Sequence, residues 1–386
     1  MTAALFAPIA FGSLALKNRV VMAPMTRSRA IGGVPNALME TYYRQRAGAG
    51  LIITEGTSPS PNGLGYARIP GLFTDEQVRG WRRVTDGVHE AGGRIVVQLM
   101  HTGRVSHPAN MPAGARILAP SPLAAPGEMW TDSLGSQPYP VPEAMNDADI
   151  ADAIGEYATA AARGIEAGFD GVELHGANGY LIDQFLNTAS NQRTDRWGSG
   201  VPSARSEAVR RQRPAVSGAV GGHMDARRDE RIDNRTRFAV AVAEASAAAI
   251  GAERVGMRIS PYGAFNGMAP DADMDAMYER LIGELNRIGL VSIHVVDHSS
   301  MGAPEVPASI KRKIRAAFRG TLILSGGYDR ARAEADLVAK NGDLIAFGRP
   351  FISNPKLVTK LRNGASLVLA DQTTFYSPGE KGYIDY

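Results

Sequence analysis

The 386-residue chain contains no cysteine. This absence excludes disulfide bonds, cysteine nucleophiles, cysteine-held zinc and cysteine-ligated iron–sulfur clusters, and it is typical of a reducing cytoplasm. No apolar run approaches the roughly 20 residues that a membrane helix needs. The first residues also lack the basic and apolar regions of a secretory signal. We therefore expect a cytoplasmic protein that does not enter a membrane.

Common nucleotide and metal motifs are missing as well. Neither GxGxxG nor GxxxxGK[ST] occurs, so neither a Rossmann nor a P-loop nucleotide site is indicated. HExxH is absent and no histidine pair stands at ligand spacing, so no metal site is expected. The net charge is +3, and residues 199–231, with seven arginines and four acidic residues, account for all of it. The remainder is neutral, which argues against a nucleic-acid partner.

Eight short apolar runs recur along the chain, and most are rich in β-branched residues. They cover residues 19–25, 50–55, 94–100, 171–175, 255–260, 291–296, 321–325 and 344–348. Segments with helical periodicity separate most of them, at 75–90, 147–168, 236–250, 273–288, 307–318 and 330–340. This alternation predicts the α/β class and a (β/α)₈ TIM barrel rather than a doubly wound sheet, with residues 1–386 as one domain.

Three segments do not follow the barrel repeat. Residues 5–16 alternate apolar positions around Gly12 and Ser13, which predicts an N-terminal β-hairpin that closes the barrel's bottom. Residues 105–142, after the third strand, are rich in proline and glycine and predict an elaborated loop with a small hairpin. Residues 199–231, after the fourth strand, lack Leu, Ile, Phe, Tyr and Lys. This composition predicts a flexible Arg-rich surface insertion. A frame-shifted stretch of coding sequence would also produce it.

The fourth predicted strand runs into three polar side chains, His175, Asn178 and Tyr180. The histidine and the amide can aim two hydrogen-bond donors at one oxygen, and the phenol can supply a proton. This set predicts the polarisation and protonation of a carbonyl or nitro compound. It contains no nucleophile, so we expect the reactive partner to come from a cofactor.

The last two predicted strands end in small residues and an arginine. In TIM barrels phosphate groups often bind at these two strand ends, where backbone N–H groups approach the anion and an arginine pairs with it. The sequence therefore predicts a phosphate site formed by Ser325, Gly326, Gly327, Gly348 and Arg349.

Motifs along nearly the whole chain give a more specific indication. They lie at residues 16–19, 23–27, 42–46, 53–56, 98–104, 175–185, 191–195, 234–238, 346–349, 354–355, 374–376 and 382–383. Together they resemble the Old Yellow Enzyme family of FMN-dependent oxidoreductases, in the branch of N-ethylmaleimide, glycerol trinitrate and xenobiotic reductases. Residues 199–231 have no counterpart in this pattern.

The resemblance implies FMN as cofactor and NADPH or NADH as reductant. It implies that Pro24, Met25 and Thr26 lie against the flavin and that Gln98 binds its pyrimidine edge. Arg258 would place a positive charge beside the N1/O2 region. The phosphate residues would be those predicted above.

The resemblance also implies an ene-reductase activity on α,β-unsaturated carbonyl or nitro compounds and maleimides, and an action on nitrate esters. Hydride would come from reduced flavin N5, His175 and Asn178 would bind the activating oxygen, and Tyr180 would protonate the alkene. Substrate-cavity residues would be Thr26, Tyr66, Met100 and Tyr376. Many relatives carry tryptophan where Met100 stands, which predicts a roomier pocket.

Other functions fit these residues less well. The dienoyl-CoA reductase branch needs an iron–sulfur cluster, which the missing cysteines exclude. A flavin-free phosphate-binding isomerase would not explain Gln98, Arg258 and the polar set after the fourth strand together. A flavin-binding barrel made inactive by residues 199–231 remains the alternative, and an oligomer is left open.

Overall fold

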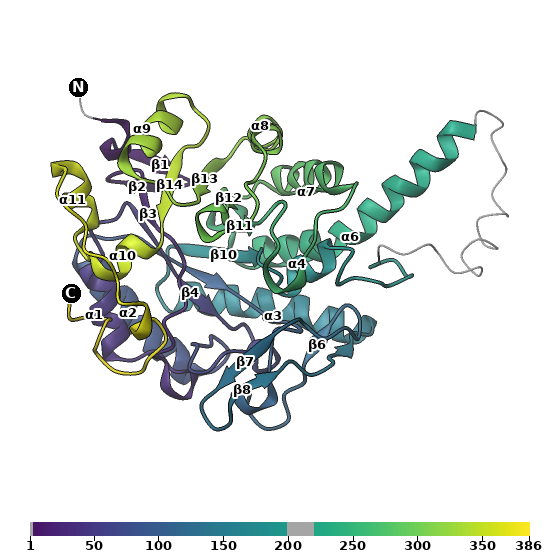
Figure 1. Cartoon of the computed structure of the whole chain (residues 1–386), viewed down its shortest axis with the longest axis horizontal. Coiled ribbons are helices and arrows are strands. Elements are labelled where there is room, and N and C mark those ends of the chain that lie inside the picture. The colour runs from purple at the N-terminus through teal and green to yellow at the C-terminus, as the bar shows by residue number, and fades with distance from the viewer. Residues whose placement is uncertain (1–2, 199–219) are drawn as a thin grey trace.

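A closed barrel of eight parallel strands forms the centre of the molecule (Figure 1). The structure, a computed structural model, describes residues 3–198 and 220–386, with the backbone only for 220–225. In chain order the strands are β3 (Val20–Met22), β4 (Leu51–Thr57), β5 (Ile95–Leu99), β10 (Gly171–Gly176), β11 (Val255–Ile259), β12 (Ser292–Val296), β13 (Thr321–Ser325) and β14 (Leu344–Phe347). Pairing of β14 with β3 closes the barrel. The predicted TIM barrel and all eight predicted strands are confirmed.

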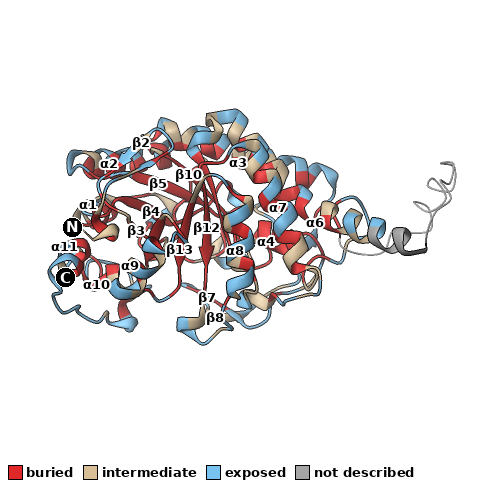
Figure 2. Ribbon diagram, turned by 90° about the horizontal axis from the view of Figure 1, so that it is seen from above, coloured by how far each residue is buried: buried red, intermediate tan, exposed pale blue. Residues whose placement is uncertain are grey.

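The strands are apolar along their length because both of their faces are covered. Every residue of β5, β11 and β12 is buried, and Figure 2 shows the strands buried within the shell of helices. One face of each strand points into the barrel and the other packs under helices, so a continuous β-branched run is favoured over an alternating one. This is the pattern from which the strands were predicted.

Helices surround the barrel. They are α1 (Ala37–Gln45), α2 (Asp75–Glu90), α3 (Asp147–Glu166), α4 (Leu181–Leu186), α6 (Val220–Ile250), α7 (Met274–Ile288), α8 (Ala308–Ala317), α9 (Arg330–Val338), α10 (Arg349–Ser353) and α11 (Leu357–Asn363). All six predicted helices are present. The prediction did not include α1, α4, α10 and α11. The first turn of α1 is capped by the Asn36 side chain. Among the described residues, no helix has the length and apolarity needed to cross a membrane.

Two small hairpins lie where the sequence predicts them. Strands β1 (Ile9–Phe11) and β2 (Leu14–Leu16) form the N-terminal hairpin, and Phe11 and Leu16 pack with the inward-facing residues of the barrel's lower end. Strands β7 (Glu128–Thr131) and β8 (Gly135–Pro138) form the hairpin within the long loop after β5. That loop also contains the short parallel pair β6 (Leu118–Ala119) and β9 (Glu143–Ala144).

The expected flexible insertion at 199–231 requires correction for its second half. Residues 220–231 belong to α6, whose first turns project beyond the barrel wall (Figures 1 and 2). This stretch contains strong helix formers such as Ala, Arg, Met and Glu, and it continues directly into the predicted helix. Arg228 and Arg231 form ion pairs with Asp273 at 2.6 and 3.7 Å. The expectation for 199–219 lies outside the described residues.

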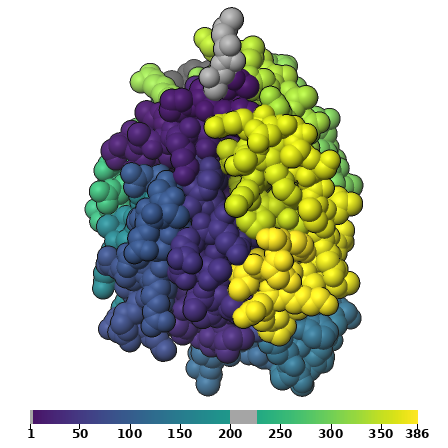
Figure 3. All heavy atoms as spheres, turned by 90° about the vertical axis from the view of Figure 1, so that its left-hand side faces the viewer, coloured from purple at the N-terminus to yellow at the C-terminus, as the bar shows by residue number. Residues whose placement is uncertain are grey.

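The C-terminal segment packs against the N-terminal part of the chain (Figure 3). Two buried arginines that follow β3 hold it through backbone carbonyls. Arg27 Nη2 donates to the Gly382 oxygen at 2.6 Å, and Arg29 Nη1 donates to the Phe375 oxygen at 2.7 Å. These contacts bring Phe375 and its neighbour Tyr376 to the carboxyl ends of the strands.

Candidate active site

One cavity of about 720 Å³ lies at the carboxyl ends of the barrel strands. Its volume suits a ligand of cofactor size. The predicted site residues that line it come from all parts of the chain. They are Pro24, Met25, Thr26, Gln98, Met100, His175, Asn178, Tyr180, Arg258, Ser325, Gly326, Gly327, Gly348, Arg349 and Tyr376. Tyr66 is the one predicted cavity residue that does not line it.

His175, near the end of β10, is a neutral hydrogen-bonding group. Its side chain is buried, and its Nδ1 atom has no hydrogen-bond partner within the described part of the chain. Burial, reinforced by the nearby positive charge of Arg258, holds the pKa of His175 well below its ordinary value. A neutral imidazole keeps one N–H donor, so His175 can donate to a ligand oxygen without carrying a charge.

Asn178 stands in a turn that the surrounding residues hold in place. Its backbone is left-handed, with φ at 62°, a conformation that asparagine tolerates better than most residues. The Asn178 N–H donates to Ser260 Oγ at 2.9 Å, and Ser260 Oγ donates to Asp183 Oδ2 at 3.3 Å. Asp183 also accepts the Gly179 N–H at 2.8 Å. Burial raises the pKa of Asp183 to about 7.

Tyr180 lies directly after this turn and is paired with Tyr66. Their hydroxyl oxygens are 3.0 Å apart and their rings meet edge to face. Burial raises the pKa of Tyr180 to about 12, so its hydroxyl stays protonated at neutral pH. Tyr66 was expected in the cavity wall, but it does not line this cavity; the edge-to-face packing of the two rings directs its hydroxyl to Tyr180 instead.

Gln98 and Arg258 present unsatisfied polar groups in the cavity. Gln98 Nε2 donates to Glu173 Oε1 at 2.7 Å, and Glu173 Oε2 lies 2.8 Å from His294 Nδ1. Within the described residues the Gln98 carbonyl oxygen accepts no hydrogen bond, and the buried Nε of Arg258 has no partner. A buried donor without a partner, such as Arg258 Nε, is costly unless a ligand satisfies it, and the Gln98 oxygen can accept a hydrogen bond from the same ligand. The imide edge of a flavin offers both complementary groups.

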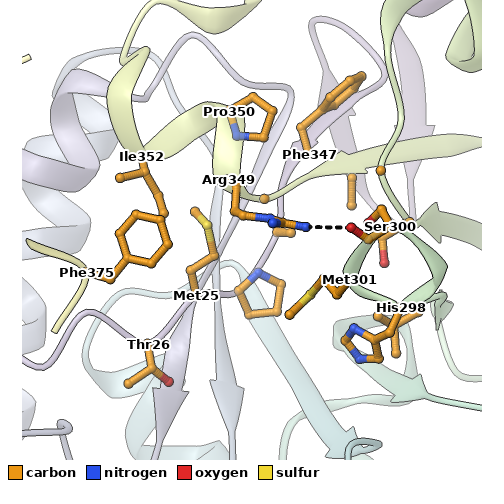
Figure 4. Close-up of a pocket in the computed structure, with 18 of the residues that line it drawn as sticks. Met25, Thr26, His298, Ser300, Met301, Phe347, Arg349, Pro350, Ile352 and Phe375 are labelled. Atoms are coloured by element: carbon orange, nitrogen blue, oxygen red, sulfur yellow. Dashed lines mark hydrogen bonds between the residues drawn. The ribbon is translucent and has the colours of Figure 1, made fainter. Parts of the chain in front are cut away.

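The opposite end of the cavity consists of closely packed backbone. Gly326 and Gly327 have φ values of 145° and 63°. A Cβ on Gly326 would lie 2.7 Å from Asp297 Cβ, and one on Gly327 would lie 2.5 Å from Ser300 Cβ. Only glycine fits these two positions. Arg349 extends beside them and donates to the Ser300 oxygen at 3.3 Å (Figure 4). Exposed backbone N–H groups of glycine, together with a nearby arginine side chain, suit the binding of an anionic group such as phosphate.

Several residues that line the cavity were not predicted, among them Phe265 after β11 and His298 and Met301 after β12. His298 Nε2 lies 2.8 Å from Asn178 Oδ1, and the His298 ring packs against Phe265 with centroids 4.4 Å apart. A signal for His298 was present, because it follows the sixth predicted strand almost directly, at the barrel face where chemistry occurs.

The cavity of this TIM barrel combines glycine backbone and an arginine at one end with a histidine, an amide and a tyrosine. These features fit a flavin-dependent oxidoreductase. The chain belongs to the family described as NADH:flavin oxidoreductase / NADH oxidase, the Old Yellow Enzyme family, whose sequence profile matches residues 4–228 and 220–367. The resemblance found in the sequence is thereby confirmed.

Individual relatives cover nearly the whole chain. A probable flavin mononucleotide-dependent alkene reductase of Leishmania infantum is 38% identical over 384 residues, covering 98% of this chain and 96% of the relative. Morphinone reductase, solved in complex with tetrahydroNAD, is 41% identical, covers 99% of this chain and 96% of its own, and has a TM-score of 0.86. The old yellow enzyme homologue of Zymomonas mobilis is 36% identical over 99% of each chain, with a TM-score of 0.86.

Family membership confirms the expected FMN cofactor and nicotinamide reductant. The expected ene-reductase activity is supported by the relatives, and the alternative of a catalytically inert flavin-binding barrel is not.

Proposed function

We propose that this enzyme reduces small electrophiles with NADPH or NADH as the source of electrons. The substrates are α,β-unsaturated carbonyl compounds, nitroalkenes and maleimides, together with nitrate esters. The observation that carries this proposal is that neutral His175, the Asn178 amide and protonated Tyr180 line the same cavity as the residues that we propose to bind the flavin. We further propose that residues 1–386 form one FMN-binding domain and that the enzyme acts in the cytoplasm, as its lack of cysteine suggests.

The flavin would fill the cavity from the glycine-lined end to Gln98. FMN, when bound, supplies the hydride from N5 of its reduced ring. The segment Pro24, Met25 and Thr26 would lie along the ring, and the Gln98 oxygen would accept its imide N–H. The Arg258 guanidinium would stabilise negative charge on the pyrimidine edge. Ser325, Gly326, Gly327, Gly348 and Arg349 would hold the phosphate.

The substrate would bind with its activating oxygen between His175 and Asn178. Two donors aimed at an oxygen on which negative charge develops lower the barrier, and loss of one such donor typically costs about 10²- to 10³-fold in rate. Tyr180 would give its proton to the carbon beside the activating group. Thr26, Met100 and Tyr376 would enclose the remainder of the substrate.

The proposal is tested by following the flavin itself. The purified enzyme, reconstituted with FMN, should be yellow, should bleach on anaerobic addition of NADPH, and should regain its colour when 2-cyclohexenone or N-ethylmaleimide is added. A matched protein with His175 and Asn178 both changed to alanine should bind FMN equally well and regain colour far more slowly. The proposal fails if no flavin is retained, or if neither compound reoxidises the reduced enzyme.

A further inference from the structure

The side chain of Asn178 is held by a residue from a distant loop. His298 follows β12, and its Nε2 atom lies 2.8 Å from Asn178 Oδ1 although the two residues are 120 positions apart. Figure 4 shows the His298 ring in the cavity wall, on the same loop as Ser300 and Met301. The ring is held from one side by Phe265. A specific contact therefore links this loop to the predicted oxygen-binding amide.

The remaining polar groups of Asn178 are almost all engaged. Its backbone N–H donates to Ser260 Oγ at 2.9 Å, and its backbone carbonyl accepts from Asn266 Nδ2 at 2.7 Å. With Oδ1 facing His298, only the Asn178 Nδ2 group has no hydrogen bond within the described residues. Asn178 lines the cavity. The free N–H₂ group is the one that a substrate oxygen requires.

The orientation of the Asn178 side-chain amide depends on whether His298 Nε2 donates or accepts the hydrogen bond between them. If Nε2 carries a proton, it donates to Oδ1 and leaves the Asn178 N–H₂ group for the cavity. If Nε2 were an acceptor, the amide would turn over and present an oxygen to the cavity, where it would repel a carbonyl or phenolate oxygen. His298 thus sets whether Asn178 attracts or repels the substrate's activating group.

His298 is poorly suited to protonate the substrate itself. Burial, assisted by the charges of Arg258 and Arg349, lowers the pKa of His298 to about 4, while Asp297 opposes that shift. The residue is neutral at physiological pH and has little tendency to give up its remaining proton. Its contribution is through Asn178.

We propose that His298 is a positioning residue, which donates its Nε2–H to Asn178 Oδ1 and so turns the Asn178 N–H₂ group toward the activating oxygen of the substrate. This inference rests on the proposed function, since it names a residue that prepares the same site. It also explains why a histidine follows β12 at the cavity.

Three variants of His298 separate positioning from packing. Glutamine places its Nε2 at the same number of bonds from Cβ as the histidine Nε2, whereas asparagine can only place its amide nitrogen at the level of histidine Nδ1. We expect His298→Gln to keep the contact with Asn178, and His298→Asn and His298→Ala to lose it. Each FMN-loaded protein is titrated with p-hydroxybenzaldehyde, whose phenolate oxygen tests the donors directly, and binding is followed by flavin absorbance. Retained flavin and melting temperature establish that each variant is folded.

The expected result is that His298→Ala and His298→Asn raise the dissociation constant of the phenol about tenfold, and that His298→Gln stays within about threefold of the parent enzyme. The effect should disappear when His298→Ala is combined with Asn178→Ala, because the group through which it acts is gone. Equal binding by the parent and His298→Ala, or full additivity with Asn178→Ala, would overturn the inference and leave the proposed function standing. A parent enzyme that binds FMN but neither the phenol nor an enone would overturn both.

Discussion

The hydroxyl oxygens of Tyr66 and Tyr180 lie 3.0 Å apart. Tyr180 lines the cavity and Tyr66 does not, so the pair connects the proposed proton donor to a residue behind the cavity lining. Burial raises the pKa of Tyr180, and the hydrogen bond with Tyr66 lowers it by a smaller amount. Tyr66 therefore makes Tyr180 a somewhat stronger acid than it would otherwise be.

We predict that Tyr180→Phe slows reoxidation of the reduced enzyme by 2-cyclohexenone about 10²- to 10⁴-fold, because the alkene loses its proton source. Flavin reduction by NADPH should be nearly unchanged, since that step takes no proton from Tyr180. Tyr66→Phe should slow the same reoxidation more mildly. Stopped-flow absorbance measures both half-reactions, and equal rates for Tyr180→Phe and the parent enzyme would exclude Tyr180 as the donor.

Arg349→Ala should weaken FMN binding. The contact proposed for Arg349 is a charge-assisted hydrogen bond to phosphate, worth roughly 1.5–3 kcal/mol, and its loss corresponds to about a 10- to 150-fold rise in the dissociation constant. Riboflavin, which has no phosphate, serves as the control, because its affinity should be the same in both proteins. Fluorescence titration of the apoprotein measures both ligands, and an equal loss for riboflavin would contradict the assignment.

Asp183 should make the protein less stable as the pH rises. Its pKa is raised from the ordinary value of 3.8 to about 7 by burial, so the native state holds a proton that the unfolded state has already lost. The stabilisation contributed by Asp183 is therefore fully present below about pH 4 and is lost by about pH 7. Between pH 5 and pH 8 the loss from this group is roughly 2 to 3 kcal/mol.

Asp183→Asn keeps the shape of the side chain but removes this titration. The melting temperature of the variant relative to the parent should rise by several degrees between pH 5 and pH 8. Glu55, whose pKa burial also raises to about 7, is present in both proteins and cancels in the comparison. A difference in melting temperature that does not change with pH would contradict a buried, titrating Asp183.

Two aspartates beside α6 should differ strongly in their effect on stability. Asp271 pairs at 2.6 Å with Arg235, whose side chain is only 2% exposed, whereas Asp273 pairs with Arg228, whose side chain is 44% exposed. Asp271→Ala leaves a buried charge without its partner and should cost roughly 3–5 kcal/mol. Asp273→Ala should cost about 1 kcal/mol or less. Denaturant unfolding measures both, and similar losses would show that burial of Arg235 is not the deciding factor.

The strands and the strand-end residues were predictable because their signals are local. A β-branched run such as the one in β12 is recognisable from neighbouring residues alone, and in a TIM barrel the chemistry follows directly after such runs. His175 lies near the end of β10, Asn178 and Tyr180 follow it, and Gly326 and Gly327 follow β13. The start of α6 was not predicted, because the Arg-rich composition before it resembles that of a solvated segment as much as that of a helix.

The sequence alone therefore determines the barrel, the order of its strands and which strand ends carry reactive side chains. The tertiary structure decides which of those side chains meet. Tyr66 contacts Tyr180 rather than the cavity, and His298 contacts Asn178 from 120 residues away. Such pairs arise only when the barrel closes and brings distant loops to one face. Their formation depends on how the rings and amides pack there, for which neighbouring residues in the chain give no signal.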